Sequence, residues 1–157
     1  MVPLYILVVA TLLLRGVGLV VEQLSSWRTC TRLALAILFA VAGATHFTEM
    51  KHDFARMVPP ALPNPMAIVY VSGVFELLGA IGLLTSRWRR PAGLGLFVLL
   101  LAVFPANVHA ALEGVPFGDK PPTPLWLRAI VQVVLLAAVG FVIGRGPRRE
   151  STDSSAR

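Results

Sequence analysis

Glu76 lies near the middle of an apolar stretch, Met66 to Leu84, that reads MAIVYVSGVFELLGAIGLL. In a helix with a rise of about 1.5 Å per residue, its carboxyl group would lie roughly 15 Å from either end. That depth corresponds to the midplane of a bilayer whose hydrocarbon core is roughly 30 Å thick. Ionisable side chains at such a depth usually face the interior of a helical bundle, where they transfer protons or bind ligands. Glu76 is therefore the first candidate for a proton site or a ligand site.

Two polar residues of a later apolar segment could lie near this carboxylate. Arg128 falls about one turn inside that segment, and Gln132 follows four residues later on the same helical face. One interpretation is that Glu76, Gln132 and Arg128 form buried polar contacts that only fix the register of the helices. The other is that Glu76 exchanges a proton or binds a ligand. The sequence alone leaves both interpretations open.

Further polar residues cluster where two apolar segments end. His46, Glu49 and His52 follow one segment, but their spacing differs from the i, i+4 histidine pair of a zinc-binding helix. We therefore predict no metal site. Asn107 and His109 lie two positions apart, so they cannot face one pocket unless Pro105 kinks their helix. We include His46 and Asn107 with Glu76, Gln132 and Arg128 in a candidate polar site within the membrane.

The composition indicates the elements that must position these residues. The chain of 157 residues is 56% hydrophobic and 14% charged, whereas a soluble domain carries about 25% charged residues. We therefore expect an all-α integral membrane bundle with a single domain over residues 1–147. Its five transmembrane helices are predicted at about 3–21, 31–47, 66–84, 91–112 and 124–144. The tail over 148–157 is polar and is predicted to be disordered.

Basic residues predict the orientation of these helices. If the five spans alternate, one side carries nine arginines and the other carries only Lys51, Arg56 and Lys120. The nine are Arg28, Arg32, Arg87, Arg89, Arg90, Arg145, Arg148, Arg149 and Arg157. Cytoplasmic loops are the ones enriched in Lys and Arg. We therefore predict a multi-pass protein of the plasma membrane with its N-terminus outside and its C-terminus in the cytoplasm. Arg15 lies within the first span and could pair with Glu22.

The net charge also indicates which partners the protein binds. The net charge of +6 is accounted for by topology and by attraction to anionic lipid headgroups, so we expect the lipid bilayer and no nucleic acid as partner. A single cysteine, Cys30, excludes an intramolecular disulfide and a CxxC redox pair.

Small residues predict the packing faces. Ser72, Gly73, Glu76, Gly79 and Ala80 form one stripe of a helix, which places Glu76 on the packed face. The opposite face, which suits lipid, carries Val71, Val74, Phe75, Leu78 and Ile81. A second stripe runs through Ala36, Ala40, Gly43 and Ala44, and Gly140 and Gly144 are spaced for close packing in the last helix.

Several segments together resemble the DoxX family of small bacterial membrane proteins. They are AGATHF, MVPPALPNP, VYVSGVFELLGAIGLL, RPAGLGLFVLLLAVFPANVHAAL and PLWLRAIVQ, and the resemblance covers roughly residues 32–143. It implies a four-helix membrane core, here preceded by one extra helix, with Glu76 as the in-membrane acidic residue of the family. The family takes its name from a subunit of a thiosulfate:quinone oxidoreductase, so the resemblance implies a redox-associated, quinone-linked membrane subunit. It supplies no catalytic residue.

Three functions are compatible with these observations. The first is a redox-associated subunit that works with other membrane or redox-complex subunits and binds a quinone near Glu76, Arg128 and His46. The second is a non-enzymatic scaffold or assembly factor. The third, a small-solute carrier, lacks support from an inverted repeat or a pair of broken helices.

Overall fold

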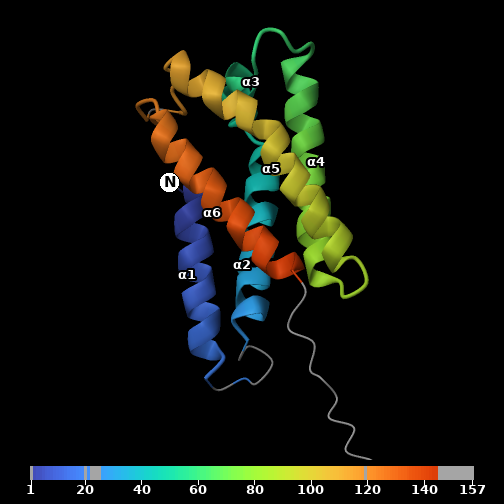
Figure 1. Ribbon diagram of the computed structural model, residues 1–157. Helices are drawn as coiled ribbons and strands as arrows, with labels where there is room; N and C mark the ends of the chain where they lie inside the picture. Colours follow the sequence, from blue (N-terminus) through green and yellow to red (C-terminus); the bar gives the residue numbers. More distant parts are fainter. Residues whose placement is uncertain (1, 20, 22–25, 119, 145–157) are drawn as a thin grey trace, which may run out of the picture.

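The computed structural model describes residues 2–19, 21, 26–118 and 120–144. These residues form six helices, joined by loops (Figure 1). The helices are α1 (Val2–Val17), α2 (Trp27–Thr45), α3 (Lys51–Met57), α4 (Pro65–Leu84), α5 (Arg89–Leu112) and α6 (Leu125–Ile143). The predicted all-α class is confirmed. The predicted disordered tail, the last four arginines and Glu22 lie outside the described residues.

Four of these helices, α2, α4, α5 and α6, are long and apolar enough to cross a membrane. By length and composition they indicate an integral membrane protein. Their bounds fall within a few residues of the predicted spans. α1 has 16 residues, which correspond to about 24 Å of helix and fall short of a full span. Beyond Val17 the chain turns, and the N–H groups of Gly18 and Val21 donate to the carbonyls of Leu14 and Val17.

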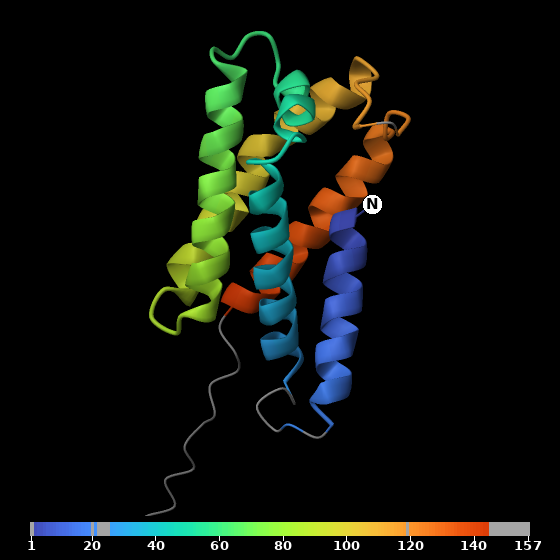
Figure 2. The same ribbon diagram turned by 180° about the vertical axis from the view of Figure 1, so that it is seen from behind.

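The long helices run up and down beside one another, with α2 in contact with α1, α4 and α6 (Figures 1 and 2). The fully buried side chains at the centre include Leu35, Phe39, Leu83, Leu96 and Val139. One end of the bundle contains the end of α1, the start of α2, the α4–α5 connection and the end of α6. We call this the basic end because it carries Arg28, Arg32, Arg87, Arg89 and Arg90. α3 and the α5–α6 connection lie at the opposite end.

The predicted stripe of α4 is confirmed. Ser72, Gly73, Gly79 and Ala80 are buried, and the side chain of Glu76 is only 14% exposed. The residues predicted to face lipid, Val71, Val74, Phe75, Leu78 and Ile81, are all exposed. Small residues therefore set the inward face of this helix, since helices in lipid associate by close packing rather than by burial from water.

The two other small-residue patterns were less informative. In α2, Ala36 and Gly43 are buried, but the prediction for Ala40 and Ala44 was wrong, because both are exposed. The side of α2 that contacts its neighbours is lined largely by larger apolar residues such as Leu35 and Phe39. In α6, nothing lies within 4 Å of a Cβ built at Gly140, so the Gly140–Gly144 spacing does not mark a close helix contact there.

α2 ends beside the middle of α4, and this early end creates the space that α3 fills. A Cβ built at Gly43 would lie 3.1 Å from the Cβ of Glu76, which is near the centre of α4. The chain then turns into α3, which packs against α4 and α5. The connection to α4 is rich in proline and contains Asn64 in the left-handed region, with φ of 51°. This backbone cannot continue a helix, so α4 begins afresh at Pro65.

Substitution by alanine can distinguish a glycine at a close helix contact, Gly82, from a glycine with open space around it, Gly140. A Cβ at Gly82 would collide with the Cβ of Ala92 on α5, which has no rotamer to adjust. We expect Gly82→Ala to lower the free energy of unfolding by about 1–3 kcal/mol through overpacking. Gly140→Ala should be neutral or stabilising by up to about 1 kcal/mol, because alanine is the better helix former. Thermal unfolding in a mild detergent measures both, and equal effects would contradict the helix contact.

Candidate functional site

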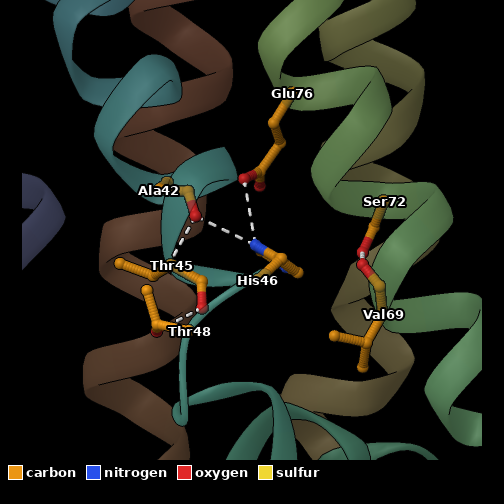
Figure 3. Close-up of polar contacts among 7 residues, drawn as sticks. All are labelled: Ala42, Thr45, His46, Thr48, Val69, Ser72 and Glu76. Carbon is orange, nitrogen blue, oxygen red and sulfur yellow. Dashed lines mark hydrogen bonds and ion pairs between the residues drawn. The ribbon is translucent and has the colours of Figure 1, made fainter.

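Glu76 and His46 face one another across the contact of α4 with the end of α2 (Figure 3). The distance from His46 Nδ1 to Glu76 Oε2 is 3.6 Å, and the two side chains are only 10% and 14% exposed. Oε2 of Glu76 is buried and has no hydrogen-bond partner among the described residues. The site therefore contains a carboxylate oxygen that the surrounding protein does not satisfy.

Two glycines bring these side chains together. A Cβ at Gly73 would lie 2.6 Å from the Cβ of His46, and a Cβ at Gly43 would lie 3.0 Å from the carbonyl oxygen of Gly73. Only glycine at both positions lets the backbones of α2 and α4 approach this closely. Ser72, next to Gly73, turns its hydroxyl back and donates to the carbonyl of Val69 at 2.9 Å, so it adds no polar partner for Glu76.

The end of α2 fixes the orientation of the imidazole. His46 Nδ1 lies 2.9 Å from the carbonyl oxygen of Ala42, and a carbonyl only accepts, so Nδ1 carries a hydrogen. Thr45 donates to the same carbonyl at 2.6 Å, and Thr48 donates to the carbonyl of Thr45 at 2.8 Å. These side chains satisfy terminal carbonyls that a helix leaves without partners.

The electrostatic setting of the pair follows from this helix end. The C-terminus of a helix carries a partial negative charge, which attracts cations and repels anions. An ionised Glu76 therefore faces the negative end of α2, whereas a protonated His46 is favoured there. A proton on Glu76 itself, or a hydrogen-bond donor from a ligand, would balance Oε2. This arrangement suits proton exchange.

Aromatic side chains cover His46 from the side of α3. The ring of Phe54 in α3 stacks on the imidazole with centroids 4.3 Å apart and an interplanar angle of 3°. Phe117, from the α5–α6 connection, packs against Phe54 at 5.0 Å. Asp53 accepts a hydrogen bond from the backbone N–H of Gly118 at 2.9 Å and pairs with Arg56. We did not predict Phe54 as part of the site; the only sequence signal was its place in the short segment KHDFARM.

The other three predicted residues form a separate polar group between α5 and α6. Arg128 donates from one terminal nitrogen to Asn107 Oδ1 at 3.1 Å and from Nε to the carbonyl of Thr123 at 3.0 Å. Gln132 is buried and donates to the carbonyl of Leu100, five residues before Pro105. The hypothesis that Arg128 and Gln132 are the partners of Glu76 was therefore wrong, because both bond to groups elsewhere and His46 takes that place.

The remaining histidines lie apart from this site. His52 and Glu49 are exposed and 4.0 Å apart, while His46 points into the bundle. Within the described ranges, no group of three or more His, Cys, Asp or Glu side chains is arranged to hold a metal ion.

The Arg128–Asn107 contact can be tested as a structural cross-link. Asn107→Leu leaves a half-buried guanidinium without one acceptor, and we expect it to cost about 1–3 kcal/mol of unfolding free energy. Adding Arg128→Met should recover most of that loss, since replacing both partners by apolar groups is close to neutral. Unfolding midpoints of the two single variants and the double variant measure the coupling. Additive losses would argue against a direct contact.

The sequence was compared with known protein families, curated proteins and solved structures. No curated protein and no solved structure matches the chain. One protein family, described as a domain of unknown function (DUF8561), matches residues 35–142. The match begins within α2 and ends within α6, so it includes both polar groups and leaves out α1. It covers more than half of the sequence, and the chain therefore belongs to the DUF8561 family.

Proposed function

We propose that this protein is a DoxX-like, redox-associated membrane subunit in which Glu76 and His46 exchange a proton with a quinone. The observation that carries the proposal is the buried Oε2 of Glu76, which lacks a hydrogen-bond partner and lies 3.6 Å from His46 Nδ1. A carboxyl group in an apolar bundle needs a proton or a donor to balance it. The pair is the kind of group that proton-coupled chemistry within a membrane requires.

The chemistry of the donor set fits a quinone. Reduction of a quinone to its quinol consumes protons along with electrons, and each ring oxygen accepts a hydrogen bond in the quinone and donates one in the quinol. Glu76 can donate when protonated and accept when ionised. His46 is held by Ala42 through Nδ1, so its second ring nitrogen remains to take up or release a proton. The electrons would pass to a partner subunit that carries its own redox centre.

Replacement of the carboxyl group tests this proposal. Glu76→Gln keeps the size of the side chain but cannot exchange a proton. We expect the purified variant to bind a short-chain ubiquinone analogue about tenfold more weakly than the unchanged protein, which is the contribution of one hydrogen bond to a charged group. Binding can be followed by the quenching of tryptophan fluorescence in detergent.

The matched control is Glu113→Gln, which changes an exposed carboxylate at the end of α5 and should bind the analogue as the unchanged protein does. No binding by any of the three proteins would contradict the quinone proposal.

A second candidate function, a scaffold or assembly factor, is favoured by a different observation. The outward face of α4 carries an open hollow of about 260 Å³ that is lined by Tyr70, Val71, Val74 and Phe75. It lies on the side of α4 away from Glu76, where an apolar helix of another membrane protein could pack. In that case Val74→Ser, within the hollow, would lower the recovery of a crosslinked partner, and the quinone analogue would not bind the unchanged protein.

The proposal includes a five-span topology in a bacterial plasma membrane. α1 packs along α2 and is apolar, although it is shorter than the other four long helices. If α1 counts as a span, the N-terminus faces the same side of the membrane as α3. The basic end then faces the cytoplasm, since cytoplasmic loops are enriched in arginine.

Labelling of single cysteines tests this orientation. In a Cys30→Ser background, Ala61→Cys and Ser86→Cys place thiols on exposed connections at opposite ends of the bundle. A membrane-impermeant maleimide should label Ala61→Cys in intact cells and Ser86→Cys only after the membrane is opened. The reverse pattern would invert the topology, and equal labelling would argue against a membrane-spanning arrangement.

A further inference from the structure

Two arginines at the basic end have buried groups without partners. Arg32 lies in the second turn of α2, and Arg89 is the first residue of α5. The Nε atoms of both are buried and make no hydrogen bond to any residue that the structure describes. The two residues remain partly exposed, so a ligand at the surface can still reach their guanidinium groups. Buried N–H donors without acceptors are uncommon and costly, so this pair calls for an explanation.

The two guanidinium groups also repel each other, because the charge of Arg89 acts on Arg32. The neighbouring arginines are engaged differently, since Arg15 lies over the ring of Trp27 and Arg28 over that of Phe141. Among the described residues the carboxylates are Glu49, Asp53, Glu76 and Glu113, and none of them belongs to the basic end. In the part of the chain that the structure describes, two adjacent positive charges therefore lack a counterion.

The backbone adds to this positive potential. α2 and α5 both begin at the basic end, and the N-terminus of a helix carries a partial positive charge and free N–H groups. Trp27 and Trp88 flank these helix starts and are more than half exposed, as is typical of side chains at the level of lipid headgroups. The missing counterion is therefore expected at the membrane surface.

We propose that Arg32 and Arg89 together bind a phosphate group, with the headgroup of an anionic phospholipid as its source. A guanidinium group offers a planar fork of N–H donors that matches the oxygens of a phosphate. One phosphate between the two side chains would accept hydrogen bonds from the accessible N–H groups of both guanidinium groups and cancel the repulsion. Basic pockets between membrane helices on the cytoplasmic side commonly hold such headgroups. The site is distinct from the Glu76–His46 pair and does not depend on its function.

The test compares two double variants with the same change in charge. Arg32→Gln with Arg89→Gln removes the proposed site, whereas Arg87→Gln with Arg90→Gln removes two exposed arginines of the same end. Each protein is titrated with short-chain phosphatidylglycerol in a neutral detergent, and bound lipid is counted by native mass spectrometry. Because each arginine near a headgroup contributes about 0.7 units of log affinity, we expect the first pair to lower the affinity about 30-fold. The control pair should lower the affinity by a factor that is several times smaller.

Two further measurements identify the source of the phosphate, and the first uses only the unchanged protein, so misfolding of a variant cannot affect it. With the unchanged protein, phosphatidylglycerol should raise the unfolding temperature more than zwitterionic phosphatidylcholine does. If inorganic phosphate alone stabilises the unchanged protein but not the Arg32→Gln/Arg89→Gln variant, the site is supported with a free anion as its ligand. Equal effects of both lipids together with no effect of phosphate would overturn the proposal, as would equal affinities of the two double variants.

Discussion

The close approach of α2 and α4 through Gly43 and Gly73 is the constraint on which the rest of the structure depends. It brings the end of α2 against the middle of α4 and leaves no room for side chains between the two backbones. His46 and Glu76 meet because of it, and α3 has a place beside α4 because α2 ends there. In a lipid environment, where apolar surface gains little by burial, such contacts between small residues determine which helices pair.

The two polar groups of the bundle differ in a way that separates structure from function. Arg128, Asn107 and Gln132 use their donors on acceptors in α5 or just before α6, so that group ties two helices together. The Glu76–His46 pair instead retains an oxygen without a partner. Proteins rarely leave a buried polar atom unsatisfied unless a proton, a ligand or a catalytic role accounts for it. That contrast, rather than the depth of Glu76 alone, directs attention to this pair.

Much of the fold could be predicted from the sequence, because the apolar runs and the stripe of small residues in α4 record local periodicity. The inward position of Glu76 followed from that stripe. Its partner did not, because His46 reaches it only after α2 ends early, and this end depends on contacts between helices distant in sequence. Arg128 and Gln132 were placed by depth along a helix, which does not specify which neighbour a side chain faces. For the same reason, Ala40 and Ala44 looked like packing residues although their side of α2 is exposed.

The early end of α2 also shortens the distance between Glu76 and the aqueous phase. Beyond Thr45, α2 no longer lies beside α4, and α3, of only seven residues, packs there instead. A helix this short is not stable alone; Phe54, Phe117 and the bond from Gly118 to Asp53 hold it in place. Local opening of such a segment requires far less free energy than unfolding of the bundle. Local opening of α3 would therefore bring water to Glu76 while the rest of the bundle stays folded.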